Sequence, residues 1–152
     1  MKSTSLLIVP ALLSLSLSLS GCLNNEFSFL RIEVNGTVES PQEGAIFIEF
    51  HHMEQGEGEL GHPLGLIEEI QTAGPGAFDH VLDYPEHAGE GLLVYAWQDT
   101  DGDEVFCGLG APDELSGASG INEGLDFEET VHVLLESVCL GPERLHADHS
   151  LD

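Results

Sequence analysis

The chain has 152 residues and a formal net charge of -25, because 28 aspartates and glutamates oppose only 3 lysines and arginines. Such a charge repels phosphate backbones and anionic lipid headgroups, which argues against nucleic acid as a partner and against electrostatic docking to a membrane. Hydrophobic residues make up 41% of the chain, and the length suits one domain with a core of its own. Wholesale disorder is therefore not expected.

Residues 1–21 are predicted to be a secretory signal peptide. Lys2 precedes an apolar run from Leu6 to Leu19 that is too short and too rich in serine for a stable membrane span. The run ends in Leu19-Ser20-Gly21-Cys22, an aliphatic residue and two small residues before a cysteine. This sequence resembles the lipobox of bacterial lipoproteins, which implies a cell-envelope protein whose membrane anchor is a lipid, with palmitate-type acyl chains, on Cys22. The alternative is an ordinary signal peptide with a chance cysteine near its end.

The residues after the lipobox bear on location and charge. In many Gram-negative bacteria the residue after the lipidated cysteine influences sorting, and Leu23 in place of an inner-membrane-retaining aspartate implies the outer membrane. Cleavage would remove Lys2 and leave Arg31 and Arg144 as the bases of the mature chain. Most carboxylates must then be solvated, protonated or neutralised by cations. We expect a surface that attracts cations and a protein suited to saline surroundings.

Two cysteines remain once Cys22 is assigned to the anchor. Cys107 and Cys139 are an even pair in a chain exported to an oxidising compartment, so we predict a disulfide between them. It would close a loop of about 33 residues and contribute about 3 to 4 kcal/mol in the chain-entropy model. The alternative, a metal-binding or catalytic thiol, is disfavoured because neither cysteine lies in a C-x-x-C motif or beside a histidine.

Short apolar runs separated by turn clusters predict six or seven β-strands after a lipidated tether at residues 22–29. The first, Leu30–Glu39, alternates between apolar and polar residues, as a half-buried strand does. Leu64–Thr72 fits either a helical stripe or a strand, and we favour the strand. The other predicted strands are Ala45–Phe50, Phe78–Tyr84, Leu92–Trp97, Val105–Cys107 after an Asp-Gly hairpin turn, and Val131–Cys139.

The segments between these runs are expected to be irregular. His51–Pro63 should be a mobile loop, Gly108–Gly124 a connection rich in small residues, and residues 141–152 a flexible tail. No convincing long amphipathic helix is present in the sequence pattern. The prediction is an all-β fold: a single antiparallel β-sandwich of about seven strands over residues 30–140.

Several motifs in this domain follow one another in a familiar order. They are Asn35-Gly36-Thr37-Val38, Gly44-Ala45-Ile46-Phe47-Ile48, Gly76-Ala77-Phe78, and Gly91–Trp97 followed by Asp99–Asp103. Over roughly residues 32–106 their order resembles the transthyretin-like and carboxypeptidase-regulatory-like sandwich modules. The resemblance implies a non-catalytic accessory or adhesive domain. The hydroxyisourate hydrolases share the transthyretin-like fold, but the chain lacks their Tyr-Arg-Gly-Ser ending, so their activity is not transferred to it.

One turn has the residues for a calcium site. Asp99, Asp101 and Asp103 alternate through it, and three such carboxylates can converge on one hard cation. The EF-hand pattern is absent, since Gly102 falls at the fourth position and Gly110 at the twelfth. The alternative is a solvated Asp-Gly turn on an acidic surface. A calcium site would need further ligands, from Glu104, Asp113, Glu114 or backbone carbonyls.

The histidines suggest a second, weaker metal hypothesis. His51-His52-Met53 together with His62 offers imidazole and thioether ligands that suit copper or zinc. As neighbours at a strand end, however, His51 and His52 would point to opposite faces, and their spacing matches no metal motif. The alternative is a set of solvated loop histidines. His80 and His132, which fall in predicted strands, are expected to be structural.

No catalytic motif stands out in the sequence. It contains no G-x-S-x-G, H-E-x-x-H, Walker or dinucleotide-binding pattern, and its acids are too abundant for one pair to be singled out as a glycosidase site. We therefore expect a non-enzymatic binding or structural module whose partner is an envelope protein or a surface ligand.

Overall fold

The computed structural model describes residues 28–53, 64–85, 91–110, 112–120 and 122–149. Within these ranges the chain forms nine strands and one short helix, which confirms the all-β prediction. The elements are β1 (Phe29–Glu39), β2 (Ala45–Met53), β3 (Leu64–Thr72), β4 (Gly76–Pro85), β5 (Gly91–Asp99), β6 (Leu115–Ala118), β7 (Asn122–Glu123), β8 (Glu128–Leu134), β9 (Ser137–Val138) and α1 (Pro142–His149).

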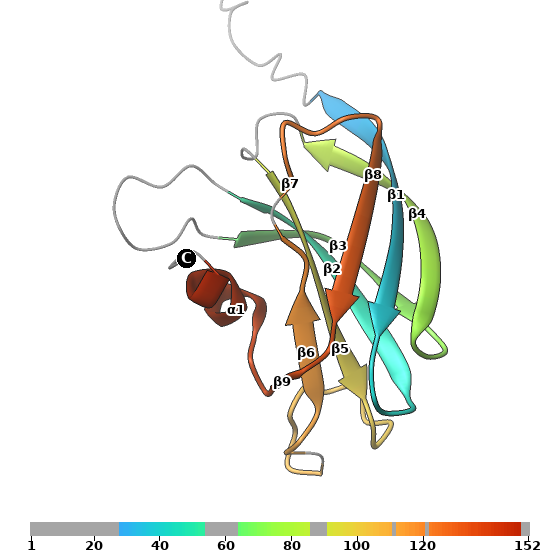
Figure 1. Cartoon of the computed structure of the whole chain (residues 1–152), viewed down its shortest axis with the longest axis vertical. Helices are drawn as coiled ribbons and strands as arrows, with labels where there is room; N and C mark the ends of the chain where they lie inside the picture. Colours follow the sequence, from blue (N-terminus) through green and yellow to red (C-terminus); the bar gives the residue numbers. More distant parts are fainter. Residues whose placement is uncertain (1–27, 54–63, 86–90, 111, 121, 150–152) are drawn as a thin grey trace, which may run out of the picture.

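The strands are arranged in two sheets that face each other as layers (Figure 1). The smaller sheet has the strand order β4-β1-β8. The larger sheet has the order β3-β2-β5-β6-β9, and β7 pairs with one end of β5. The molecule is thus sandwich-like, with the larger sheet built around β2 and β5.

The pairing of β8 differs from the predicted antiparallel arrangement. β1 pairs with β4 antiparallel, but it pairs with β8 in parallel, from Glu33↔Glu128 to Glu39↔Leu134. After β7 the chain enters β8 from the end at which β1 begins, so both strands run the same way (Figure 1). Hydrophobic alternation is the same in either direction, which is why the sequence pattern did not reveal this parallel pair.

The main core fills the space between the two sheets. β1 shows the predicted alternation, with Ile32 and Val34 fully buried and Arg31 and Glu33 exposed. Gly36 interrupts this apolar row because the Phe78 ring occupies the space that a side chain there would need. The buried side chains of the core come from both sheets: Ile32, Val34, Val38, Ile46, Ile48, Phe50, Phe78, Leu82, Tyr84, Leu92, Val94, Ala96, Leu115, Val131, Val133 and Leu135.

A second hydrophobic cluster covers the outward face of the larger sheet. Its buried members are Phe47, Tyr95, Trp97 and, from α1, Leu145. The rings of Phe47 and Trp97 stack with their centroids 4.3 Å apart. Helix α1 lies over this face (Figure 1), and the segment before it is held by a 3.0 Å hydrogen bond from the Tyr95 hydroxyl to the Leu140 carbonyl. The expected flexible tail is therefore a packed helix over Pro142–His149.

Other predicted strand boundaries also change. β2 continues through His51 and His52 to Met53, so these residues belong to a strand and not to the expected loop. Val105–Cys107 forms no strand, and β6 lies inside the stretch expected to be a connection. The last predicted strand is divided into β8 and β9, because the chain crosses between the sheets at Leu135 and Glu136.

The N-terminal predictions fall on residues without a described structure. The signal peptide, Cys22 and most of the tether lie in residues 1–27, outside the described ranges. In the part of the chain that is described, no helix has the length and apolar character needed to cross a membrane.

Candidate functional site

The turn after β5 is organised around Asp99. This residue ends the strand and is only 4% exposed. Its Oδ1 accepts a 2.7 Å hydrogen bond from the Gly102 amide, and its Oδ2 accepts one of 3.1 Å from the Glu104 amide. Gly102 and Glu104 both have positive φ angles, 78° and 58°, which turn the backbone back towards the Asp99 carboxylate. The loop therefore wraps around Asp99.

Glu114 approaches the same turn from the other side, just before β6. It is fully buried at 0% exposure. Its Oε1 accepts a 3.1 Å hydrogen bond from the Thr100 amide, and its Oε2 accepts one of 2.6 Å from the Cys107 amide. A buried carboxylate with two charge-assisted hydrogen bonds is well placed to hold this loop closed.

Among the described residues, Asp99, Asp101 and Glu114 form a group of potential metal ligands, which we call the acidic cluster. Each offers one carboxylate oxygen, and these oxygens lie within 4.8 Å of one another. The sequence hypothesis also included Asp103, but this side chain instead accepts a 2.8 Å hydrogen bond from the Val105 amide. Asp103 still lies beside Asp101, and Glu114, one of the further ligands that the sequence allowed, completes the group.

The electrostatics of this acidic cluster favour a positive neighbour. The pKa of the exposed Asp101 carboxyl is raised, first by partial desolvation and then by the charges of Asp103 and Asp99. Oxygen ligands of this kind suit a hard divalent cation such as calcium, which takes six to eight oxygens at about 2.3 to 2.6 Å. Three carboxylates would supply part of such a shell, and backbone carbonyls or water would complete it.

Among the described residues, the structure does not bring the histidines together with other potential metal ligands. His51 is buried, with its Nε2 2.8 Å from Glu49 Oε2 and its Nδ1 without a hydrogen-bond partner. His52 pairs in register with Gly65 on β3. His62 lies outside the described ranges, and within those ranges no group of potential metal ligands contains a histidine.

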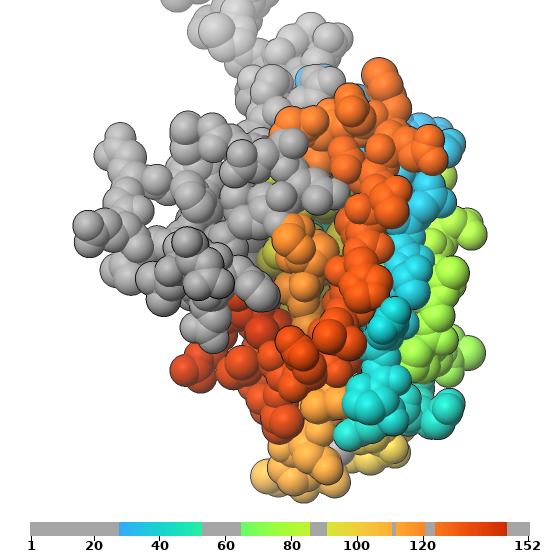
Figure 2. All heavy atoms as spheres, in the orientation of Figure 1, coloured from blue at the N-terminus to red at the C-terminus, as the bar shows by residue number. Residues whose placement is uncertain are grey.

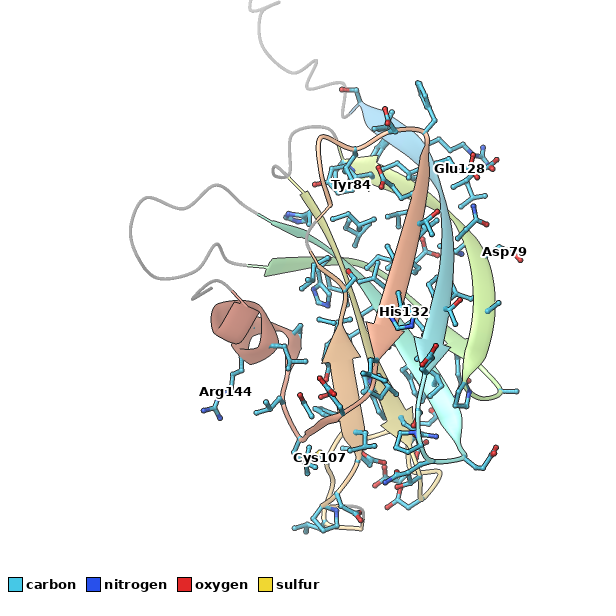
Figure 3. All side chains as sticks on the ribbon, viewed as in Figure 1. Asp79, Tyr84, Cys107, Glu128, His132 and Arg144 are labelled. Atoms are coloured by element: carbon cyan, nitrogen blue, oxygen red, sulfur yellow. A yellow bond between two sulfur atoms is a disulfide. The ribbon has the colours of Figure 1, made fainter. Side chains whose placement is uncertain are left out.

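His80 and His132, the other histidines in the described strands, also lie beside carboxylates. His80 Nε2 is 3.1 Å from Glu68 Oε2, linking β4 to β3 across the two sheets. The exposed His132 on β8 has its Nε2 3.2 Å from Glu39 Oε1 (Figure 3 labels His132). These contacts are consistent with structural roles.

Cys107 and Cys139 lie at disulfide distance. Their sulfur atoms are 2.01 Å apart and their Cα atoms 5.6 Å apart. Cys107 is in the turn after β5 (Figure 3), and Cys139 follows β9 immediately before the segment that leads to α1. The Cys139 amide also donates a 3.1 Å hydrogen bond to the Glu114 carbonyl. The cysteine pair thus joins the segment from Leu140 through α1, which we call the covering segment, to the loop that contains the acidic cluster.

No protein-family model, curated protein or solved structure matches the chain.

Proposed function

We propose that this protein is a bacterial envelope lipoprotein, anchored in a membrane through a lipid on Cys22, whose acidic sandwich-like domain is a non-enzymatic binding or structural module. The observation that carries the proposal is the lipobox Leu19-Ser20-Gly21-Cys22, directly upstream of a folded domain whose first strand starts at Phe29. A few residues between lipid and fold would hold the domain close to the membrane surface. Leu23 after the cysteine favours the outer membrane.

The folded domain supports export to an oxidising compartment. A cysteine pair at disulfide distance is the arrangement expected of exported proteins and is rare in the cytosol. The motifs that resemble transthyretin-like and carboxypeptidase-regulatory-like modules fall on β1, β2, β4 and β5, in that order. We keep that family resemblance as part of the proposal, together with its implication of an accessory or adhesive role.

Metabolic labelling tests the anchor directly. The full chain, produced in a Gram-negative host with a palmitate analogue, should become labelled and sediment with membranes. Cys22→Ser should lose the label, whereas Cys139→Ser is the matched control and should keep it, since Cys139 is paired within the domain. An unlabelled protein with Cys22 intact would contradict the proposal.

Calcium binding at the acidic cluster is a second candidate function. It is favoured by the 4.8 Å grouping of Asp99, Asp101 and Glu114 carboxylate oxygens. Calorimetric titration of the full chain with calcium should give saturable heat that Asp101→Asn removes. Asp79→Asn is the matched control, because it removes an exposed acid on β4, away from the cluster, and should leave the heat in place. If wild type gives no saturable heat, the carboxylates serve only to hold the loop.

A further inference from the structure

A groove opens where β8 ends beside the turn between β1 and β2. It is a hollow of about 530 Å³, open to solvent, and both segments contribute to its wall. Figure 2 shows them side by side on the viewed face of the molecule. We call it the β8 groove. It lies at the end of the sandwich where the chain crosses from the smaller to the larger sheet.

The floor of the β8 groove is apolar. It is formed by Leu115, Leu134 and Leu135, of which Leu135 is fully buried and Leu134 is 43% exposed. Val138, the register partner of Leu115 across β6 and β9, is 53% exposed. Partners across an antiparallel pair share one face of the sheet, so Val138 places an exposed aliphatic side chain next to Leu115. Exposed aliphatic side chains gathered at a hollow are typical of a docking surface.

The rim of the β8 groove is acidic. Glu39 and Glu136 line it and are exposed, and neither Arg31 nor Arg144 reaches it. His132, on β8 beside the rim, contacts Glu39, with its Nε2 3.2 Å from Glu39 Oε1. An occupant must therefore bring positive charge to the rim and aliphatic carbon to the floor. Hydrated metal ions lack the second property, and anionic lipids lack the first.

The same charge argument excludes a second copy of this chain as the occupant. After cleavage before Cys22 the chain would carry 28 acids and only Arg31 and Arg144 as bases. Two such chains repel each other, and neither can offer a cluster of cations to the partner's rim. The complementary surface must belong to a different molecule.

We propose that the β8 groove binds a basic segment of another envelope protein, one that places leucine-like side chains on the floor and lysine or arginine against Glu39 and Glu136. This inference rests on the proposed function, because it names the partner class and the surface of the binding module. The floor supplies most of the affinity through desolvation, while the rim selects the charge of the partner and speeds association.

The test uses the full chain, purified with its anchor in a nonionic detergent, and a fluorescent peptide. The peptide has eight residues: two adjacent leucines, one lysine on each side of them, and otherwise glycine and serine, with both ends blocked. Fluorescence anisotropy should show saturable binding that weakens as salt is added. A peptide with glutamate in place of lysine should not bind.

Matched variants locate the binding. Leu134→Ser should weaken it about tenfold, as loss of an interface anchor does. Val81→Ser is the control, because Val81 is equally exposed at 42% but lies on β4 at the opposite edge of the smaller sheet. Likewise Glu39→Gln with Glu136→Gln should weaken binding, whereas Glu33→Gln with Asp83→Asn should not.

Two outcomes would overturn the inference. One is no saturable binding to the wild-type chain. The other is equal loss in the groove and control variants, which would mean that the peptide binds the acidic surface at large. Neither outcome bears on the lipid anchor, which is measured separately by labelling. If labelling fails, the peptide-binding result can still be interpreted.

Discussion

The two outward faces of the sandwich are built differently. On the smaller sheet, β1 and β8 alternate between buried and exposed residues. Most outward side chains of this sheet are polar or charged, among them Asp79 on β4 and Glu128 on β8 (Figure 3), and Val81 and Leu134 are exposed among them. On the larger sheet, β5 is buried along its whole length, and its outward rings are covered by Phe106 from the turn after β5 together with Leu140 and α1. One face is solvated and the other has a hydrophobic layer of its own.

The contrast shows how the surroundings of a strand determine the hydrophobic pattern of its sequence. A strand with one wet face needs alternation, whereas a strand covered on both faces can be apolar throughout. The covered face also holds the cysteine pair and adjoins the acidic cluster. The solvated face and the β8 groove at its end are exposed.

The largest loss of stability is expected from a substitution in the hydrophobic layer on the outward face of the larger sheet. Trp97→Ala should cost about 3 to 5 kcal/mol of unfolding free energy, because it removes the ring that stacks on Phe47 and packs against Phe106 in this layer. Thr130→Ala, an exposed change on β8, should cost no more than about 1 kcal/mol. Chemical denaturation measures both. Similar costs for the two variants would mean that the outward face of the larger sheet is not a second core.

This contrast also explains which strands the sequence could predict. β1, β4 and β5 have either clear alternation or long apolar runs, and each was found with nearly correct bounds. β6 was missed because Leu115-Ser116-Gly117-Ala118 has the composition of a loop. Gly117 is needed there because a side chain would meet the Leu134 carbonyl where the sheets approach each other, a contact that only the fold creates.

The helix α1 was missed for a related reason. It is short, and Pro142 at its start and polar residues along it give a weak pattern. Its stability comes from packing, since Leu145 is buried against the aromatic layer. A sequence window that contains only the helix cannot show this distant partner.

The next largest effect should come from the cysteine pair, which fastens the covering segment. Replacing both Cys107 and Cys139 with alanine should cost about 3 to 4 kcal/mol in the chain-entropy model, since the pair is separated by 32 residues. Limited proteolysis should then cut near Gly141 earlier than in wild type. A variant with unchanged denaturation and unchanged cleavage would show that packing alone holds the covering segment.

A smaller loss is expected from Glu114→Gln. The change removes the charge from a buried acceptor of two backbone hydrogen bonds, and hydrogen bonds to charged groups contribute about 1.5 to 3 kcal/mol. Asp103→Asn should change stability by about 0.5 kcal/mol or less, as surface substitutions usually do. Thermal melts in the presence of a chelator measure this structural part, free of any calcium contribution. If the two variants have equal effects, the hydrogen bonds of Glu114 do not stabilise the loop.

The acidic cluster shows the limit of prediction from spacing. Asp99 and Asp101 were identified because they alternate through an obvious turn. Asp103 was grouped with them by the same alternation, but the loop folds back around Asp99 at Gly102 and Glu104, so the alternation is lost. Glu114 comes from beyond the turn, and its position depends on how β6 joins the sheet, which no local pattern encodes.

The smallest predicted effect is that of pH. Glu69 lies opposite Glu49 in the sheet, and its pKa is raised, first by burial of the carboxyl and then by the charge of Glu49. The folded state therefore holds this proton more tightly than the unfolded state, whose reference value is 4.5. The stabilisation is complete below that value and is lost as pH rises through the higher folded pKa.

Melting temperature should accordingly rise as pH is lowered from 7 towards 5. Glu69→Gln should raise the melting temperature at pH 7 and flatten this pH dependence. Added salt should also stabilise the wild-type chain at pH 7, because it screens the excess of acids. A melting temperature that changes with neither pH nor salt would contradict the claim that repulsion among the acids destabilises the fold.

The most direct test of a lipid-anchored, disulfide-stapled domain is the intact mass of the protein purified from bacterial membranes without reductant. The account predicts a chain that begins at Cys22, carries the added mass of a diacylglyceryl group, and is lighter by two hydrogens because Cys107 and Cys139 are joined. A chain with an unmodified Cys22, or one with the mass of two free thiols, would contradict it.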